Sequence, residues 1–295
     1  MLEHTPVMPQ EVIKFLAPHR NENFIDATCG LGGHAKLILE KISPNGKLLA
    51  IDQDGVALAT AEKNLEKFSN RVTFVHNNFS EIGLLIRDWK VPRIDGILFD
   101  LGVSSYQLSE KERGFSFSQN ARLDMRMSPE RQRVSAYEII NRSDRRKLQK
   151  ILRVFGEEPF AAKIAKEIIK ARTSKPIETT TELVEVIRRA TPPKYRFSQE
   201  KHFATSTFRA LRMAVNDELE VLESGLKQAI GILSPGGRMV VISFHSLEDR
   251  IVKNFFRKNP NLEILTNKPV MASGEEVEQN HKARSAKLRA AIKIG

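Results

Sequence analysis

The stretch Phe24-Ile-Asp-Ala-Thr-Cys-Gly-Leu-Gly-Gly-His34 decides the fold. It begins with apolar residues, reaches an acid at Asp26, and continues into glycines where a strand would enter a helix. Gly30, Gly32 and Gly33 carry no Cβ, so the backbone N–H groups of this turn can approach a ligand closely. A strand, a glycine-rich turn and a helix in this order predict a βα unit that holds a ligand at its turn.

The sequence around this stretch predicts further units of the same kind. Apolar runs at 23–26, 47–51, 72–76, 94–99 and 238–244 are separated by helical stretches. Apolar strands that alternate with helices are typical of a parallel sheet with both faces covered. Two more runs, 262–266 and 288–294, predict a closing antiparallel pair. We therefore expect an α/β fold with a mostly parallel sheet of seven strands.

The interval between the fourth and fifth predicted strands is long enough for a second domain. One helix, 217–233, belongs to the crossover, and the rest has helical signals. Ser143 is placed to cap a helix over 144–155, residues 158–172 have helical periodicity, and Thr179 or Thr180 can cap a helix that ends near 189. We expect residues 1–105 and 213–295 to form the sheet domain and residues 106–212 to form an inserted helical domain.

The charge of the chain is concentrated in this insertion. The 295 residues include 47 Lys and Arg against 36 Asp and Glu, a net charge of +11. Residues 106–212 hold 24 of the basic and 13 of the acidic residues, so the remainder of the chain is neutral. Clustered positive charge favours nucleic acid as a partner, and a merely solvated basic surface is the alternative.

Composition excludes several other classes of protein. The chain has no run of about 20 apolar residues and no leader-like N-terminus, so we expect no membrane span and a cytoplasmic location. The single cysteine, Cys29, is consistent with a reducing compartment and excludes an internal disulfide framework. The seven histidines show no ligand spacing, so we expect no metal.

Two acids near the glycine-rich turn distinguish between nucleotide-containing cofactors. Asp52 follows the second strand, where a carboxylate can accept both hydroxyls of an adenosine ribose. The glycines do not form the pattern G-x-G-x-x-G, and Asp26 would repel a pyrophosphate but attract an ammonium group. These features favour S-adenosyl-L-methionine over NAD, and a plain βα turn without a ligand is the third possibility. Phe79, after the third strand, stands either beside an adenine ring or in the core.

The residues after the fourth strand suggest methylation of an exocyclic amine. Such a nitrogen is a poor nucleophile because its lone pair is conjugated into the ring. Hydrogen-bond acceptors for both of its hydrogens can pull the nitrogen towards tetrahedral geometry. Asp100 with the carbonyl of Leu101 or Gly102 can supply them, and Ser104 can add a hydrogen bond. His245, after the fifth strand, is a candidate substrate contact, although a lone histidine is more often structural. Methylation at cytosine C5 would need a cysteine nucleophile outside the cofactor turn.

Six motifs in a fixed order make the chain resemble one family over almost its whole length, from position 4 to position 289. The family is that of the bacterial small-subunit (16S) ribosomal RNA cytosine-N4 methyltransferases, the RsmH (formerly MraW) family. The motifs are Asp26-Ala-Thr-Cys-Gly-Leu-Gly-Gly-His34, Phe99-Asp-Leu-Gly-Val-Ser-Ser-Tyr-Gln107, Arg113-Gly-Phe-Ser-Phe117, Leu123-Asp-Met-Arg-Met127, Ala210-Leu-Arg-Met-Ala-Val-Asn216 and Ser243-Phe-His-Ser-Leu-Glu-Asp-Arg250.

The resemblance implies a Rossmann-like class I methyltransferase whose helical insertion helps to hold RNA. It implies transfer of a methyl group from S-adenosyl-L-methionine to N4 of one cytidine in 16S ribosomal RNA, near the decoding centre of the small subunit. The cofactor contacts that it implies are Gly32, Gly33, His34, Asp52, Phe79, Asp100 and Gln107. One departure concerns RNA: Ser206 stands where the family usually has Arg.

Basic and aromatic residues past the fourth strand, and one in the tail, are candidate RNA contacts. A flipped cytidine needs a planar group to stack on, and a lid with an apolar underside is the other interpretation of the phenylalanines. The candidates are Arg113, Phe115, Phe117, Arg122, Arg126 and Arg284. A non-catalytic RNA-binding assembly factor that retains a cofactor pocket is the alternative function. The sequence leaves the choice between monomer and homodimer open.

Overall fold

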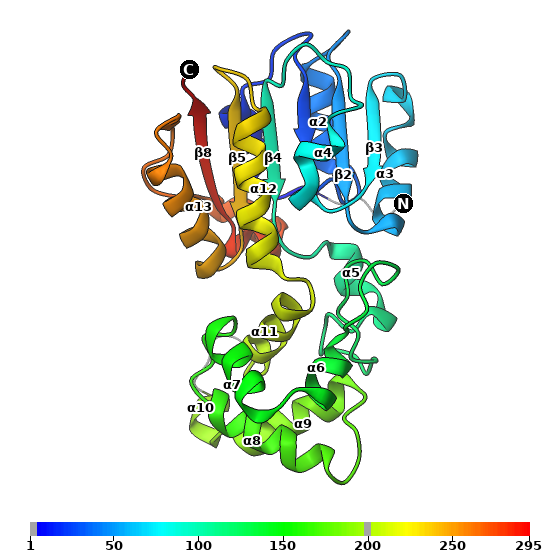
Figure 1. Ribbon diagram of the computed structural model, residues 1–295, viewed down its shortest axis with the longest axis vertical. Helices are drawn as coiled ribbons and strands as arrows, with labels where there is room; N and C mark the ends of the chain where they lie inside the picture. Colours follow the sequence, from blue (N-terminus) through cyan, green and yellow to red (C-terminus); the bar gives the residue numbers. More distant parts are fainter. Residues whose placement is uncertain (1–4, 198–201) are drawn as a thin grey trace. The chain divides into compact units, whose positions relative to one another are not determined.

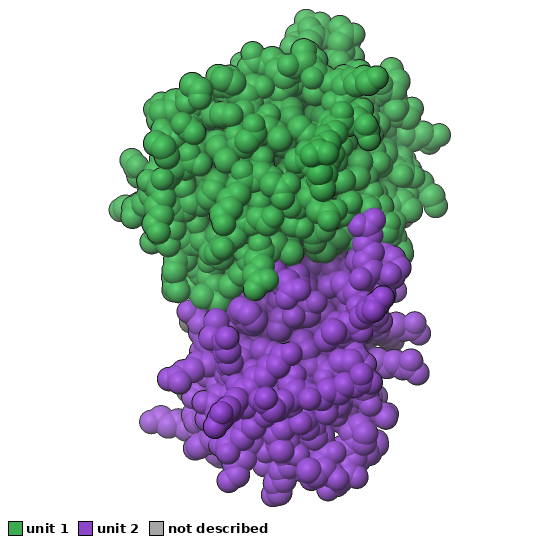
Figure 2. All heavy atoms as spheres, in the orientation of Figure 1, with its two compact units in different colours: residues 1–102, 219–295 green, residues 103–218 purple. Residues whose placement is uncertain are grey.

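The computed structural model describes residues 5–197 and 202–295. The chain divides into two compact units, one formed by residues 1–102 and 219–295 and the other by residues 103–218 (Figure 2). We call them the sheet unit and the helical unit, and each is described by itself. The sequence suggested an insertion over 106–212, and the structure divides the chain at 102/103 and 218/219.

The sheet unit is built on one eight-stranded sheet of the Rossmann-like class (Figure 1). Seven strands follow the order β3-β2-β1-β4-β5-β8-β6, in which β1 to β5 are parallel and β8 runs antiparallel to its neighbours. These strands are β1 (Phe24–Asp26), β2 (Leu48–Asp52), β3 (Val72–His76), β4 (Gly96–Asp100), β5 (Arg238–Ser243), β6 (Leu262–Ile264) and β8 (Lys287–Lys293). The predicted α/β fold and the predicted antiparallel closing pair are confirmed. The two-residue strand β7 (Val270–Met271), which pairs with β8, was not predicted.

Alternate residues of each strand pack against helices on opposite faces of the sheet. Leu48 and Ala50 of β2 belong to one apolar cluster, while Leu49 and Ile51 belong to another. The first cluster joins the sheet to α1 (Pro9–Leu16), α2 (Gly33–Lys41) and α3 (Gly55–Asn64). The second joins it to α4 (Ile82–Leu85), α12 (Glu218–Ile232) and α13 (Ser246–Lys258). Burial on both faces explains why the strands read as continuous apolar runs.

Short helical segments complete the sheet unit. The helix α14 (Gly274–Gln279) is followed by the 3-10 segment η4 (His281–Ser285), and two further 3-10 segments, η1 (Glu66–Phe68) and η2 (Phe79–Glu81), follow α3 and β3. None of the helices among the described residues is long and apolar enough to cross a bilayer.

The helical unit has an apolar core of its own, to which its main helices contribute. The helices are α5 (Ser105–Ser109), η3 (Lys111–Arg113), α6 (Ala136–Arg142), α7 (Arg145–Val154), α8 (Ala161–Arg172), α9 (Thr180–Ala190), α10 (Pro193–Phe197) and α11 (Thr205–Val215). Of the two predicted caps of α9, Thr179 is the one observed, and it accepts a hydrogen bond from the backbone N–H of Glu182. The predicted cap at Ser143 is wrong. Asp144 caps α7 instead, and its carboxylate accepts a hydrogen bond from the N–H of Lys147.

Candidate cofactor and active site

Three adjacent parallel strands each end in an aspartate. β1 ends at Asp26, β2 at Asp52 and β4 at Asp100, and β1 pairs with both of the other two. The strand order reverses at β1: the strands β2 and β3 lie on one side of it, and β4 and β5 lie on the other. Open α/β sheets bind their ligands at such a switch point, outside the carboxyl ends of the strands. The sheet order therefore brings three carboxyl groups, predicted from separate stretches of sequence, to one edge.

The glycine-rich turn after β1 offers backbone at this edge. Gly30 has φ +53°, and a Cβ placed there would meet nothing within 4 Å. Gly32 caps α2 with φ +87°, and a Cβ at Gly33 would come within 3.2 Å of Pro6. The N-terminal segment thus packs closely over the start of α2, while the Gly30 side of the turn stays open. This openness is what a ligand that approaches the backbone requires.

Asp52 is held in place by the backbone on both sides of it. Its Oδ2 accepts a hydrogen bond of 2.7 Å from the N–H of Gly30, and its Oδ1 accepts one of 2.8 Å from the N–H of Asp54. Burial raises the pKa of Asp52 to about 6, and the two backbone N–H groups oppose that rise. A carboxylate has about four lone-pair sites, so both oxygens of Asp52 retain acceptor capacity for a pair of hydroxyl groups.

Asp26 is a buried carboxyl group that is only partly satisfied. It is 1% exposed, and its Oδ1 accepts one hydrogen bond of 3.2 Å from the N–H of Thr28. Its Oδ2 is buried and has no hydrogen-bond partner among the described residues. Burial raises the pKa of Asp26 to about 7, against the opposing influence of His34 and Thr28. A buried, unsatisfied acceptor of this kind is costly unless a cation or donor meets it.

Asp100 and His34 face each other at the same edge. His34 Nε2 lies 3.6 Å from Asp100 Oδ2, and His34 is only 6% exposed. The backbone N–H of Asp100 donates to Thr28 Oγ1 over 2.6 Å, which fixes the end of β4 against the glycine-rich turn. Asp100 Oδ1 and both ring nitrogens of His34 are buried without a hydrogen-bond partner among the described residues. Thr28 was not singled out in the sequence, although it lies inside the same motif.

These polar groups fit S-adenosyl-L-methionine. Two unpartnered carboxylate oxygens, on Asp26 and Asp100, suit a cofactor that carries an ammonium and a sulfonium, since both are cations. The same oxygens would repel the pyrophosphate of NAD. Asp52 would hold the ribose, and Gly30 leaves room for the approach of the ligand to the turn.

Phe79 has the packing role, one of the two that the sequence left open. Its ring packs edge-to-face on Phe99 with a centroid distance of 5.3 Å, and a Cβ at Gly225 of α12 would lie 2.5 Å from it. Phe79 is nevertheless only half-buried. It is therefore a partly buried residue packed against the core on the second face of the sheet, and its contact with an adenine ring stays a prediction.

Cys29 does not have the properties of a nucleophile. The thiol is buried in the glycine-rich turn, and burial raises its pKa well above the ordinary value, as do the neighbouring carboxylates Asp26 and Asp52. A reactive cysteine needs the opposite environment, one that favours the thiolate. The sequence-based exclusion of cytosine-C5 chemistry is consistent with this environment.

Ser104 and Gln107 are brought together within the helical unit, as the capping box of α5. The N–H of Gln107 donates to Ser104 Oγ over 3.1 Å, and the N–H of Ser104 donates to Gln107 Oε1 over 3.0 Å. Gln107 is 4% exposed. Both side chains that the sequence offered for catalysis and cofactor binding thus contribute to the start of this helix.

His245 has a similar capping position in the sheet unit. It is the N-cap of α13, and its Nδ1 accepts from the N–H of Glu248 over 3.3 Å. Its Nε2 lies 3.2 Å from Glu248 Oε1, and both residues are buried. Glu248 Oε2 also accepts from the N–H of Phe244. These contacts support the structural interpretation of His245, and Glu248 is the partner that the sequence did not reveal.

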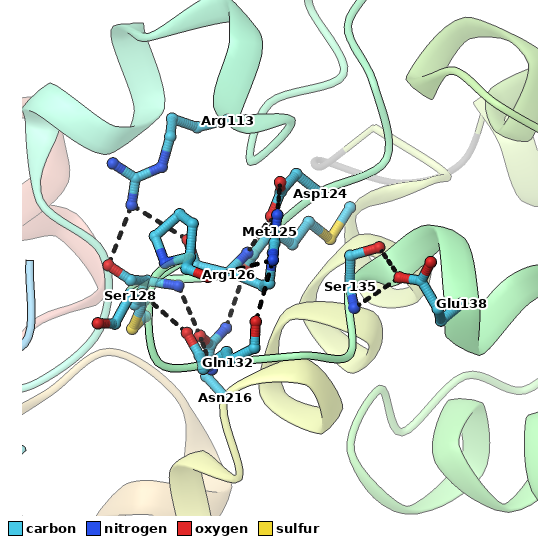
Figure 3. A network of polar contacts seen from close by, with 11 residues as sticks. Arg113, Asp124, Met125, Arg126, Ser128, Gln132, Ser135, Glu138 and Asn216 are labelled. Atoms are coloured by element: carbon cyan, nitrogen blue, oxygen red, sulfur yellow. Dashed lines mark hydrogen bonds and ion pairs between the residues drawn. The ribbon is translucent and has the colours of Figure 1, made fainter.

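Two of the arginines proposed for RNA are engaged with protein (Figure 3). Arg126 forms a fork with Asp124, with distances of 2.8 and 2.7 Å, and also donates to the carbonyl groups of Pro129 and Gln132. Burial opposes ionisation of Asp124, but the hydrogen bonds from Arg126 outweigh it and lower the pKa of this carboxyl group. Arg113 donates to the carbonyl oxygens of residues 126 and 127. Both guanidinium groups therefore stabilise the loop between η3 and α6.

The other candidate RNA contacts differ in exposure. Phe115 is 7% exposed and lies in the core of the helical unit. Phe117 is half-buried and stacks on His202 with a centroid distance of 4.6 Å. Arg122, in the helical unit, and Arg284, in the sheet unit, are exposed. Exposure leaves Arg122 and Arg284 as the candidates with access to a phosphate, whereas burial makes Phe115 a packing residue.

Comparisons with known proteins identify the family of the chain. A sequence model described as the MraW methylase family matches residues 1–294. The chain is 47% identical over 309 residues to the ribosomal RNA small subunit methyltransferase H of Geobacter sulfurreducens, with 99% of each chain covered. It is 49% identical over 290 residues to the protein of the same name from Trichormus variabilis, covering 98% of this chain and 92% of that one.

A solved structure also matches along the whole chain. It is an rRNA methylase from Streptococcus thermophilus, 10% identical, with a TM-score of 0.46 and coverage of 100% of this chain and 99% of the other. The sequence comparisons are the stronger ones, since they join high identity to nearly complete coverage. The chain therefore belongs to the MraW methylase family.

Proposed function

We propose that this protein methylates N4 of a cytidine in 16S ribosomal RNA, near the decoding centre of the small ribosomal subunit. The observation that carries the proposal is the set of strand-end aspartates, in which Asp26 and Asp100 each present an unpartnered oxygen beside the open glycine-rich turn. The names of the relatives support ribosomal RNA of the small subunit as the substrate. The reaction would take place in the cytoplasm.

The coarser statement follows from family membership. The protein is an S-adenosyl-L-methionine-dependent methyltransferase with a Rossmann-like class I fold. The bound cofactor supplies an electrophilic methyl group on a sulfonium. The residues of the chain have to bind the cofactor, orient the accepting amine and exclude competing nucleophiles.

Asp100 is the residue that we assign to the amine. We assign its Oδ1 to accept a hydrogen bond from an exocyclic N–H, which is supported by its lack of a partner among the described residues. Thr28 fixes the backbone of Asp100, and His34 lies beside its other oxygen. Gly102, two residues later, has φ +97°, which lets the chain turn away immediately after the strand. The carbonyl of Leu101 or Gly102 would accept the second amine hydrogen. Together the two acceptors hold the nitrogen lone pair out of conjugation with the ring.

The functional test is methyl transfer to small subunits. Subunits from a strain that lacks this methylation are incubated with the protein and cofactor labelled in its methyl group, and digested RNA is analysed for N4-methylcytidine. Asp100→Asn should lower kcat by at least roughly 100-fold, because the amide cannot act as a charged acceptor. Asp88→Asn, an exposed aspartate of the sheet unit, is the matched control and should retain full activity.

The outcome also separates the alternative function. A non-catalytic assembly factor would bind S-adenosylhomocysteine and RNA but would transfer no label to any cytidine. Label in a methylated base other than N4-methylcytidine would retain the enzyme and reject the proposed target atom. Full activity of Asp100→Asn would remove Asp100 from the mechanism.

A further inference from the structure

The helical unit contains a polar cavity, lined by none of the strand-end aspartates. It has a volume of about 550 Å³ and is formed by α8, the end of α9 and the start of α10, which are labelled in Figure 1. Its lining includes Lys163, Arg188, Arg189, Thr191, Pro192 and Arg196. Four cationic side chains around one cavity are a concentration of charge that folding alone does not require.

The charges of this cavity are only partly neutralised. Arg188 pairs with Glu185 over 2.7 Å, and Arg189 lies 3.7 Å from Glu167. Exposed pairs of this kind are weak, so they do not hold the guanidinium groups away from another anion. The cavity therefore keeps a net positive charge after its two acidic neighbours are counted.

Lys163 and Arg196 have donors left over. Lys163 contacts the ring of Phe160, with its Nζ 5.5 Å from the ring centroid, and it has no ion-pair partner among the described residues. Arg196 donates through Nη1 to the carbonyl of Arg188, while its Nε is buried without a partner in the described part of the chain. A buried guanidinium N–H without an acceptor indicates a place for an anion.

An exposed aromatic residue follows one of these cations in the chain. Phe197 follows Arg196 directly at the end of α10 and is 87% exposed. Pairing of a cationic groove with an accessible aromatic plane is typical of surfaces that bind single-stranded nucleic acid, where the cations contact phosphates and the ring stacks on a base. An acidic peptide would use the cations but would leave the ring without a partner of matching shape.

We propose that this cavity, which we call the phosphate cavity, binds the backbone of single-stranded RNA and that Phe197 stacks on one of its bases. The proposal rests on the proposed function, since it takes ribosomal RNA as the substrate. Contacts to phosphate and a stacked ring position a strand without reading its sequence. The phosphate cavity is thus an anchor for RNA outside the target cytidine.

The salt dependence of RNA binding tests the charge of the cavity. Lys163→Gln with Arg189→Gln removes two exposed cations from it, and Arg145→Gln with Arg146→Gln removes two exposed cations from α7 as a matched control. Affinity for a labelled single-stranded RNA of about 12 nucleotides is measured by fluorescence anisotropy across a range of salt. The slope of log affinity against log salt should fall by about 0.7 for each phosphate that the cavity variant no longer neutralises, and it should stay unchanged in the control. Equal slopes for the two variants would overturn the proposal.

Phe197 gives an independent test that does not change charge. Phe197→Ala should weaken binding of the same RNA by roughly 5- to 150-fold, and Phe197→Trp should restore it. An acidic peptide of equal charge that competes as well as the RNA, together with unchanged affinity of Phe197→Ala, would assign the cavity to a protein partner and reject this proposal.

The unmodified protein separates this proposal from the proposed function. If it fails to methylate small subunits while the cavity variants lose RNA affinity as described, the proposed function fails and the RNA cavity remains. If methylation occurs and the cavity variants match the control in RNA affinity and in KM for small subunits, the cavity proposal fails alone.

Discussion

At the scale of the residue, the buried carboxyl group of Asp26 lowers stability when it is ionised. The unfolded chain loses this proton near the ordinary aspartate pKa of 3.8, whereas burial raises the pKa in the folded chain to about 7. Between these values the folded state holds a proton that the unfolded state has released, so the contribution of Asp26 to stability falls as pH rises. Each unit of pKa difference corresponds to about 1.4 kcal/mol.

We therefore predict that Asp26→Asn stabilises the cofactor-free protein at pH 8, by on the order of 2–4 kcal/mol, with the gain vanishing near pH 4. The amide oxygen can still accept from the N–H of Thr28. Urea unfolding at several pH values, read as the difference between the two proteins, gives the measurement. The same variant should bind S-adenosylhomocysteine more weakly, because the acceptor for the ammonium group has lost its charge. A stability difference that is constant with pH would show that the buried carboxyl group is not the cause.

The residues at the strand ends could be predicted from sequence, and the capping residues could not be distinguished from them. Asp26, Asp52 and Asp100 follow apolar strands directly, so the sheet edge alone places them. Ser104, Gln107 and His245 also follow strands, yet in the structure their side chains satisfy backbone N–H groups at the starts of helices. The residue types that cap helices are also those that bind ligands, and only the backbone geometry distinguishes the two uses.

At the scale of the helix, α12 contains a matched pair of glycines. A Cβ at Gly225 would lie 2.5 Å from the ring of Phe79, whereas a Cβ at Gly231 would meet nothing within 4 Å. We predict that Gly225→Ala destabilises the protein by roughly 1–3 kcal/mol, because it forces Phe79 away from Phe99. Gly231→Ala should stabilise it by up to about 1 kcal/mol through helix propensity.

Chemical denaturation of the two variants makes the comparison. Because Phe79 is also the proposed neighbour of the adenine ring, Gly225→Ala should weaken cofactor binding as well, which calorimetry would measure. If both variants have the same stability and the same cofactor affinity, the position of the Phe79 ring does not depend on the absence of a side chain at Gly225.

The loop between η3 and α6 contains an arginine that contacts protein groups and another that is exposed. Arg126 bonds Asp124 and two backbone carbonyl groups, while Arg122 is exposed. We predict that Arg126→Gln lowers the free energy of unfolding by about 1–3 kcal/mol, since it leaves partly buried acceptors unpaired. Arg122→Gln should leave stability within about 0.5 kcal/mol of the original protein.

RNA affinity distinguishes the roles further. Arg122→Gln should reduce the salt dependence of binding by about 0.7, the value for one phosphate on a single strand. An equal reduction in Arg126→Gln, with stability unchanged, would return Arg126 to the RNA-binding set.

Elements were predictable where one physical pattern dominated. The parallel strands were identified because burial on both faces requires apolar runs. Threonine is a good N-cap, so the sequence offered Thr179 or Thr180 as the cap, and the structure shows Thr179 in a capping box with Glu182. The strand β7 has only two residues and is held by pairing with β8, so no local pattern reveals it. At α7 two adjacent residues are both good caps, and the choice of Asp144 over Ser143 depends on where α6 ends.

At the scale of the whole molecule, the two units have separate apolar cores. The clusters of the sheet unit contain only residues from 1–102 and 219–295, and that of the helical unit contains only residues from 103–218. Units with their own cores can unfold in separate steps. The strand-end site belongs to the sheet unit, whereas Gln107, which the family resemblance implies as a cofactor contact, belongs to the helical unit.

We predict that S-adenosylhomocysteine stabilises the sheet unit selectively. At a concentration of roughly 100 times its Kd, a ligand contributes about 2.7 kcal/mol to the state that binds it. For a unit of this size that corresponds to a rise in Tm of about 5–10 °C. Scanning calorimetry should show this rise in one transition, and hydrogen exchange should show protection at the glycine-rich turn and at the ends of β2 and β4.

Hydrogen exchange in the peptide that contains Gln107 tests whether this residue binds the cofactor. Because its side chain already completes the capping box of α5, we expect exchange at residues 104–109 to be nearly the same with and without the ligand. Strong protection there, with both transitions shifted together, would instead show that Gln107 binds the cofactor and that the ligand couples the two units. Asp52→Asn provides the control, because loss of the ribose acceptor should remove the protection in the sheet unit whichever outcome holds for Gln107.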